Sequence, residues 1–196
     1  MNALREWYEF VKVAAVDRMV ASFFPTSKAA AKRMCDLVHW ETGKLFVELG
    51  PGRGGNLTNE ILSRMQKDAI LVLFETNPAF INALKHIDDS RIIIIPKSAE
   101  HASEILREYG LSNARAVISG IPFSRLDEQT RKNTMQGIHD ILEEGGNCIM
   151  YQVRRTVRKE MQRVFGNVQA FHTWDYLGFL KIYQSKKHVN GNGIAA

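Results

Sequence analysis

The stretch VELGPGRGG (residues 47–55) decides the fold, because an apolar strand pattern ends there in glycines at alternating positions. Gly50, Gly52 and Gly54 are followed by a helical pattern, LTNEILSRM (57–65). Glycines at this place permit a tight turn from strand to helix and let the backbone approach a bound molecule closely. We therefore expect a ligand where this strand ends.

An acidic residue closes the next strand pattern, LVLFE (71–75). A carboxylate at the tip of the second strand, here Glu75, can accept hydrogen bonds from both hydroxyls of a ribose. Residues 50–55 also satisfy the dinucleotide pattern G-x-G-x-x-G, so a nicotinamide enzyme is one alternative. Glu48 disfavours it, because an acid facing the turn would repel a pyrophosphate but could bind an ammonium group. S-adenosylmethionine has that ammonium and no phosphate, and we expect it as the cofactor, with no metal.

Strand and helix patterns alternate from residue 45 onward, and this alternation indicates an α/β fold with a mostly parallel, doubly wound sheet. Two final strand patterns with no helix between them predict a terminal hairpin and hence an antiparallel strand near the C-terminal end. We expect a seven-stranded Rossmann-like sheet with strands over 45–49, 71–75, 91–95, 115–119, 147–153, 168–174 and 178–185. The helices are expected over 57–65, 78–87, 102–110, 127–144 and 157–166.

The first 44 residues are expected to form an N-terminal helical extension. Apolar residues recur at helical spacing over residues 1–20, with Trp7 and Tyr8 beside basic side chains. This helix could pack on the domain or lie in the interface of an anionic membrane surface. Pro25 ends it, and a second helix is expected over Ala29–Trp40, N-capped by Thr26 or Ser27. A domain over 45–186 and a flexible tail over 187–196 would complete the chain.

Composition indicates an ordinary globular protein, with 45% hydrophobic and 24% charged residues and a net charge of +5. The excess of positive charge favours anionic partners without choosing between RNA and a membrane surface. Cys35 and Cys148 lack metal-ligand spacing and are expected to be reduced core residues, which suits the cytoplasm. No signal peptide or spanning segment is predicted, so any contact with the membrane would be peripheral, at its inner face.

Four stretches together, ELGPGRGG, FETNPAF, SGIPF and FFPTSKAAAKRM, make the chain resemble the class I S-adenosylmethionine-dependent methyltransferases. Within them it is most similar to the short bacterial phospholipid N-methyltransferases, relatives of the rRNA adenine dimethylases. The resemblance runs from the amphipathic start to about Lys186. It implies that the methionine part of the cofactor lies at Glu48, Gly50, Gly52 and Gly54, with the ribose at Glu75.

The resemblance implies further cofactor contacts outside the glycine loop. Thr76 and Asn77 would border the adenosine, and Thr26 and Ser27 would close over the cofactor. At the end of the third strand, Ser98 and Ala99 stand where Asp-Ala is commoner. Ser98 accepts a hydrogen bond from adenine less strongly than an aspartate would, so Glu100 is an alternative adenine partner.

The fourth strand ends in SGIPF (119–123), where enzymes that methylate a base amine place Asn or Asp before aliphatic-Pro-aromatic. Gly120 removes that side-chain acceptor, which a conjugated amine needs and an aliphatic amine does not. We therefore expect Ser119 and Gly120 to offer backbone groups to an amine, with Ser119 also beside the cofactor. Pro122 would fix the turn, Phe123 would form a wall, and Tyr151 or His172 are candidate bases, unless water takes the proton.

These observations predict an N-methyltransferase that acts on a phospholipid or aminolipid headgroup, most readily phosphatidylethanolamine, with no obligatory protein partner. An rRNA adenine N-methyltransferase remains the alternative enzyme. A non-catalytic membrane- or RNA-binding module of the same fold is the third hypothesis, against which the intact glycine loop and Glu75 argue.

Overall fold

The computed structural model describes residues 26–152, 156–175 and 178–188. The predicted amphipathic helix over 1–20 and residues 189–196 of the predicted tail lie outside the described residues. Within the described part of the chain, no helix is both long enough and apolar enough to cross a membrane.

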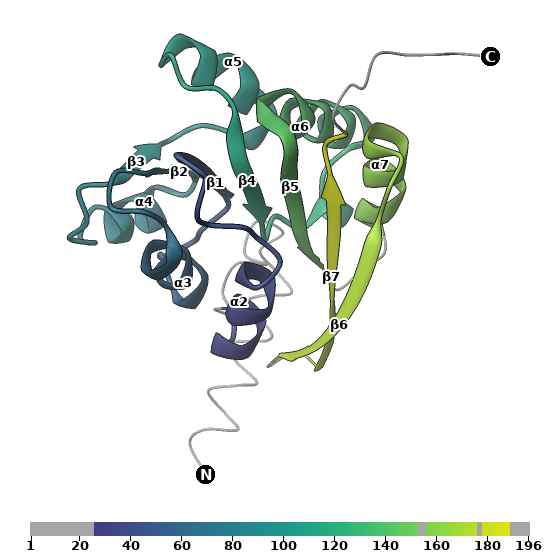
Figure 1. Ribbon diagram of the computed structural model, residues 1–196, viewed down its shortest axis with the longest axis horizontal. Coiled ribbons are helices and arrows are strands. Elements are labelled where there is room, and N and C mark those ends of the chain that lie inside the picture. The colour runs from purple at the N-terminus through teal and green to yellow at the C-terminus, as the bar shows by residue number, and fades with distance from the viewer. Residues whose placement is uncertain (1–25, 153–155, 176–177, 189–196) are drawn as a thin grey trace.

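A seven-stranded sheet forms the centre of the fold (Figure 1). Its strands are β1 (Leu45–Leu49), β2 (Ile70–Phe74), β3 (Ile92–Ile95), β4 (Ala114–Ser119), β5 (Leu142–Gln152), β6 (Gln169–Asp175) and β7 (Gly178–Lys186). The order across the sheet is β3-β2-β1-β4-β5-β7-β6. Strands β1 to β5 are parallel, and β7 is antiparallel to both of its neighbours. The predicted doubly wound sheet with a terminal hairpin is confirmed.

Helices cover both faces of the sheet (Figure 1). Two separate groups of buried side chains, one on each face, make up the core. One group takes its helical members from α5 (Ala102–Glu108), α6 (Glu128–Ile141) and α7 (Thr156–Phe165). The other group takes them from α2 (Lys28–Cys35), α3 (Asn56–Arg64) and α4 (Pro78–Leu84). Burial on both faces explains why the parallel strands read as near-continuous apolar runs.

Helix α2 ends earlier than the sequence predicts, at Cys35 rather than at Trp40. The Asp36 carboxylate forms ion pairs with Lys32 and with Arg64 of α3, and the chain turns away there. Trp40 is instead buried beyond the helix, where its indole Nε1 donates to the Cys35 carbonyl at 2.9 Å and its ring stacks on Phe46. The predicted last turns of this helix are instead a loop that packs on the core through Val38 and Trp40.

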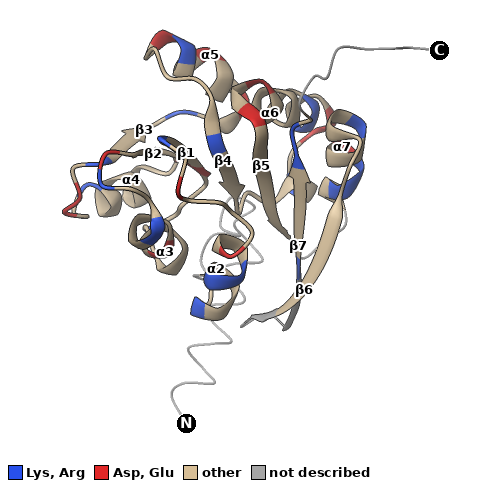
Figure 2. Ribbon diagram, in the orientation of Figure 1, with Lys and Arg blue, Asp and Glu red and all other residues tan. Residues whose placement is uncertain are grey.

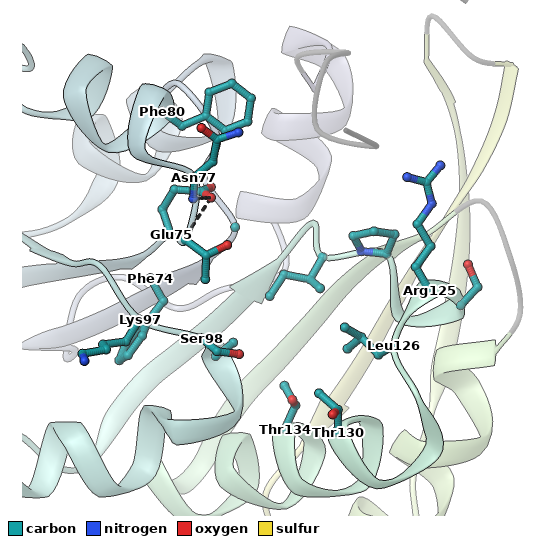
Figure 3. A pocket seen from close by; sticks show the side chains of 16 residues that line it. Phe74, Glu75, Asn77, Phe80, Lys97, Ser98, Arg125, Leu126, Thr130 and Thr134 are labelled. Carbon is teal, nitrogen blue, oxygen red and sulfur yellow. Dashed lines mark hydrogen bonds between the residues drawn. The ribbon is translucent and has the colours of Figure 1, made fainter. Parts of the chain in front are cut away.

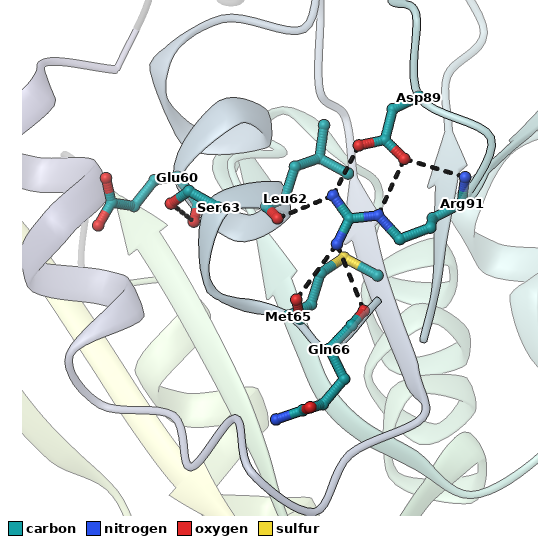
Figure 4. A network of polar contacts seen from close by, with 7 residues as sticks. All are labelled: Glu60, Leu62, Ser63, Met65, Gln66, Asp89 and Arg91. Atoms are coloured by element: carbon teal, nitrogen blue, oxygen red, sulfur yellow. Dashed lines mark hydrogen bonds and ion pairs between the residues drawn. The ribbon is translucent and has the colours of Figure 1, made fainter. Parts of the chain in front are cut away.

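A guanidinium group fastens the end of α3 to the start of β3 (Figure 4). Arg91 donates to the carbonyl oxygens of Leu62, Met65 and Gln66 and forms an ion pair with Asp89 at 2.6 Å. The last carbonyls of a helix have no partner within the helix and carry partial negative charge, so a cation is favourable there. This network lies at the amino ends of the strands, away from the site described below.

Helix α7 is amphipathic. Val157, Met161 and Phe165 are buried in the core, whereas three basic side chains are exposed. Figure 2 shows the basic positions of α7 in blue. They are Arg158, Lys159 and Arg163.

Cys35 and Cys148 are buried and free, and burial raises the pKa of both thiols, as expected of unreactive core cysteines.

Candidate active site

The glycine loop after β1 has the backbone conformation that its sequence demands. Gly50, Gly52 and Gly54 have φ angles of 72°, 62° and 74°, in the left-handed region that favours glycine. A Cβ at Gly54 would lie 2.4 Å from Cδ1 of Ile87, and one at Gly50 would lie 2.9 Å from Cγ1 of Ile121. The loop therefore packs closely against the segments that follow α4 and β4, and larger residues would push them apart.

Glu75 organises the loop from the end of β2. Its Oε2 accepts from the Gly52 N–H at 3.0 Å, and its Oε1 accepts from the N–H groups of Thr76 and Asn77 at 2.8 and 2.9 Å. The side chain is only 7% exposed, so the carboxylate is held in one position. Oε1 already accepts two hydrogen bonds, whereas Oε2 accepts one and keeps a lone pair that a ligand hydroxyl can use. The Asn77 side chain in turn caps α4 by accepting from the Ala79 N–H.

Glu48 lies beneath the loop within β1 and not on the wall of the pocket described below. It is 2% exposed, and its Oε2 accepts from the Thr58 hydroxyl of α3 at 2.8 Å. Burial raises the pKa of this carboxyl to about 7, with a smaller contribution in the same direction from the Glu75 charge. A cation brought close to it would stabilise the ionised form.

A pocket of about 620 Å³ opens at the carboxyl ends of β2, β3 and β4 (Figure 3). It adjoins the point where the strand order reverses between β1 and β4, which is where open α/β sheets bind ligands. One end, which we name the cofactor end, is lined by Gly50, Glu75, Thr76, Asn77, Ser98 and Ala99. The other, which we name the substrate end, is lined by Ile121, Pro122, Ser124, Arg125 and Leu126.

The cofactor end brings together most of the residues that the resemblance selected for the adenosine. Ser98 and Ala99, which begin the short 3-10 helix η1 (Ala99–His101), face it from the end of β3. Glu100, the alternative adenine partner, is not among the lining residues. Thr130 and Thr134 of α6 line the same pocket and were not predicted. They stand one helical turn apart and so share one face of α6. That spacing is the feature of the sequence from which a shared position at the pocket could have been predicted.

Thr26 and Ser27 approach the glycine loop through α2 and α3. The Ser27 hydroxyl caps α2 by accepting from the Ala30 N–H, so Ser27 is the cap between the two predicted candidates. The Thr26 carbonyl accepts from Nδ2 of Asn56, the first residue of α3, at 2.9 Å. This bond ties the segment to the residue that follows the glycines, although neither Thr26 nor Ser27 lines the pocket.

Of the four residues predicted at the loop after β4, Pro122 lines the pocket, whereas Ser119, Gly120 and Phe123 are not among its lining residues. Ser119 is buried, and its Oγ accepts from the Ile121 N–H at 3.2 Å, whereas Gly120 is exposed. Pro122 lines the pocket, but Phe123 is fully buried in the core and forms no part of the pocket wall. Phe123 starts the short 3-10 helix η2 (Phe123–Arg125), and its ring anchors that helix to the sheet.

Gln152, at the end of β5, is a residue that the sequence did not single out. Its Nε2 donates to the Ile121 carbonyl at 2.6 Å, and its Oε1 accepts from the Phe123 N–H at 3.3 Å. The amide group is thus hydrogen-bonded to the residues immediately before and after Pro122, and it fixes the loop between them. Tyr151, the neighbouring candidate base, packs against the core group on the other side of the sheet and does not line the pocket.

These residues fit S-adenosylmethionine. The cofactor end offers a fixed carboxylate for hydroxyl groups and glycine backbone for close approach, and Glu48 lies behind the glycines without a cationic partner among the described residues. Within the same residues, no group of three or more His, Cys, Asp or Glu side chains could hold a metal ion.

Known proteins resemble this chain in part of its sequence and in its fold. No family model matches the chain. It is 23% identical over 129 residues to an ornithine lipid N-methyltransferase of Singulisphaera acidiphila, covering 65% of this chain and 67% of that protein. TrmN from Thermus thermophilus matches with a TM-score of 0.68 at 13% identity, over 85% of this chain and 51% of that one. A SAM-dependent O-methyltransferase from Thermotoga maritima matches with a TM-score of 0.61 at 9% identity, over 83% and 66%.

The fold is that of the class I S-adenosylmethionine-dependent methyltransferases. The relative's name and these structural neighbours point to an enzyme that uses this cofactor. The chain spans about half the length of the TrmN structure, and other solved methyltransferases of the fold include an rRNA methylase from Streptococcus thermophilus. The fold therefore leaves the methyl acceptor open, and the expected relation to the rRNA adenine dimethylases stays a prediction.

Proposed function

We propose that this chain transfers methyl groups from S-adenosylmethionine to the aliphatic amine of an aminolipid headgroup, such as phosphatidylethanolamine or an ornithine-type lipid. The observation that carries the proposal is the relative named as an ornithine lipid N-methyltransferase, whose match extends over 65% of this chain. The geometry of the loop after β4 agrees with this acceptor.

Gly120 supports an aliphatic amine because nothing in its surroundings requires a glycine. A Cβ there would meet only the Gly50 carbonyl oxygen, at 4.0 Å, and its φ angle is not positive. A side-chain acceptor would therefore fit, yet this chain lacks one. A conjugated amine needs an acceptor to localise its lone pair, whereas a deprotonated aliphatic amine is nucleophilic without one.

The chemistry asked of the protein is then mainly positioning. When bound, the cofactor supplies an electrophilic methyl group on a sulfonium centre. Glu75 and the glycine loop would hold it, and Gln152 would keep Pro122 and Gly120 in place beside the amine. Fixing the two reactants in line removes much of the entropy of their encounter. The amine must lose a proton before it attacks, and the open mouth of the pocket gives it access to water.

Membrane association is also part of the proposal. The amphipathic pattern over residues 1–20 would let the enzyme lie on the inner face of the cytoplasmic membrane, where its lipid substrate is found. That segment lies outside the described residues. Its deletion should abolish binding to vesicles if it is interfacial.

The experiment is a transfer assay with methyl-labelled cofactor and three acceptors: phosphatidylethanolamine vesicles, ornithine-type lipid in detergent, and rRNA. We expect label in the lipid fraction. Glu75→Gln should weaken cofactor binding about 10- to 100-fold by calorimetry, because an amide NH₂ must then face at least one backbone N–H. Glu41→Gln, at an exposed position far from the pocket, is the matched control.

Three results would count against the proposal. Label found only in RNA would favour the rRNA enzyme. Cofactor binding without transfer to any acceptor would favour the non-catalytic module. Equal cofactor affinity in Glu75→Gln and the native protein would remove Glu75 from the cofactor site.

A further inference from the structure

We propose that the first turn of α7 is a docking surface for an anionic membrane, which it holds close to the substrate end of the pocket. The surface consists of Arg158 and Lys159, with Arg163 one turn after Lys159, and we name it the α7 basic face. It is separate from the amphipathic pattern over residues 1–20. The inference rests on the proposed function, because it concerns how a lipid substrate reaches the pocket.

The α7 basic face begins at the edge of the sheet where the pocket opens. Strand β5 ends there at Gln152, and α7 begins four residues later at Thr156. Helix α7 lies beside the 3-10 helix η2, which forms part of the substrate end. Val157 of α7 and Phe123 of η2 are buried in the same core group, which holds the two elements together. A membrane in contact with the first turn of α7 is therefore near the mouth through which a headgroup would enter.

The charges of α7 are placed against the electrostatic preference of a helix. The N-terminal end of a helix carries partial positive charge, so acidic residues stabilise the first turn and basic residues destabilise it. Helix α6 follows this rule, with Asp127 as its cap and Glu128 in its first turn. The first turn of α7 instead holds Arg158 and Lys159 and no acid. An arrangement that costs the helix stability is expected where a partner outside the chain makes use of it.

The acids nearest to the α7 basic face are paired with other cations. Glu160 is only 6% exposed and forms an ion pair with Arg163 at 3.2 Å, which accounts for Arg163 within α7 itself. The pKa of Glu128 on α6 is lowered mainly by Lys132, which it contacts at 2.6 Å, and Lys159 makes a smaller contribution. Arg158 and Lys159 are exposed and belong to none of the ion pairs within the described residues. Their charges are therefore available to an anionic surface.

The composition of this helix favours a membrane over RNA. Residues 154–163 contain five basic residues and one acid, and such a cluster on an amphipathic helix is typical of segments that bind anionic lipids. The exposed residues of α7 are Arg158, Lys159, Gln162 and Arg163. None of them is aromatic, whereas RNA-binding surfaces commonly stack unpaired bases on aromatic side chains. Positive charge without a stacking surface suits a layer of lipid phosphates.

The test measures the binding of the full chain to sedimented vesicles of phosphatidylglycerol and phosphatidylcholine, which contain no primary amine. We expect Arg158→Gln/Lys159→Gln to bind at least about tenfold more weakly than the native protein at low salt, since each cation near the surface contributes about fivefold. The difference should shrink as salt is raised, because salt screens exposed charges. It should vanish on vesicles of phosphatidylcholine alone.

Lys67→Gln/Arg107→Gln is the matched control, because it removes the same charge from two exposed positions at the opposite edge of the sheet. Lys67 precedes β2, and Arg107 lies in the last turn of α5, before β4. This variant should bind anionic vesicles as the native protein does. Equal weakening in both double variants would show that only net charge matters and would overturn the docking surface. Unchanged binding in Arg158→Gln/Lys159→Gln would overturn it as well.

Methyl transfer provides a second measurement. With phosphatidylethanolamine in anionic vesicles, kcat/KM of Arg158→Gln/Lys159→Gln should fall at least about fivefold, whereas in neutral detergent it should equal that of the native protein. Equal loss in detergent would show that the substitutions disturb the pocket and would overturn the proposal. Weaker binding to rRNA without weaker binding to vesicles would assign the α7 basic face to RNA and also overturn it.

The proposed function and the docking surface can fail separately. Vesicle binding requires no methyl acceptor, so it decides the docking surface even if the protein methylates no lipid. Binding that depends on Arg158 and Lys159, together with no transfer to any lipid, would support the docking surface and overturn the proposed function. Transfer to lipid in detergent, together with equal vesicle binding by both double variants, would do the reverse.

Discussion

At the cofactor end of the pocket Glu75 accepts hydrogen bonds from three backbone N–H groups, whereas at the substrate end the loop around Pro122 is gripped by the side chain of Gln152. Both arrangements connect the ends of adjacent strands, since β1 pairs with β2 and β4 pairs with β5. Glu75 uses a carboxylate that only accepts, whereas Gln152 uses an amide that both donates and accepts. At each end of the pocket, one buried side chain thus holds the backbone of a loop in place.

The largest expected effect is at the cofactor end and concerns Glu48. Its pKa of about 7 in the folded protein exceeds the ordinary value of 4.5, because burial disfavours the charged form. Its contribution to stability is therefore fully present below pH 4.5 and is lost as pH rises through 7. The free energy of unfolding should lose about 3 kcal/mol from this group alone over that range.

This loss can be measured by urea unfolding of the cofactor-free native protein and of Glu48→Gln, each at pH 5 and at pH 8. Between pH 5 and pH 8, the free energy of unfolding of Glu48→Gln should rise by about 3 kcal/mol relative to that of the native protein, since a neutral amide does not titrate. Thr58→Val should move the loss to higher pH, because the Thr58 hydrogen bond favours the ionised carboxylate. Parallel pH profiles for Glu48→Gln and the native protein would show that the buried charge has no such effect.

An effect of comparable size should separate close packing from backbone strain in the glycine loop. Gly54→Ala combines a positive φ with a contact of 2.4 Å to Ile87, and should destabilise the fold by roughly 2–4 kcal/mol. Gly110→Ala is the matched control, because Gly110 has a φ of 68° and a Cβ there meets nothing within 4 Å. It should cost about 1 kcal/mol. Equal shifts in Tm would mean that the loop tolerates a methyl group.

The smallest expected effect on stability is at the substrate end. Gln152→Met keeps the volume of the side chain but removes both hydrogen bonds to the loop, at about 1 kcal/mol of stability. Because the loop would then be free to shift, kcat should fall about tenfold while the Kd of the cofactor stays unchanged. Gln136→Met, whose hydrogen bond joins two exposed residues of α6, is the control. A change in cofactor Kd would break the division between the two ends.

Most of the fold could be predicted because its signals are local. The run LFVEL coincides with β1, and Asn77 and Pro78 begin α4 through a side-chain cap and a fixed φ. The end of α2 could not be predicted, since it depends on the ion pair between Asp36 and Arg64 of another helix. Apolar spacing does not distinguish a helical turn from a loop packed on the core.

The candidate site divides in the same way. Gly50 and Glu75 belong to short motifs and line the pocket as expected. Gln152 carries no motif, because an amide near the end of a strand acquires its role only when the sheet brings β4 and β5 together. Phe123 does belong to a motif, but the prediction of its role was wrong. An aromatic residue after proline can form a pocket wall or anchor a loop in the core, and its full burial shows that Phe123 is a core anchor.

The position of β7 in the sheet bears on the order in which the protein can fold during synthesis. It follows every other described strand in the chain, yet it lies between β5 and β6. The ribosome must therefore release this hairpin before β5 gains its second neighbour. Gln184 of β7 then donates to the Leu37 carbonyl, between α2 and β1, and to the Asn147 side chain. Until that moment the edge of β5 is unpaired, so a nascent chain stalled near residue 170 exposes a strand that invites association.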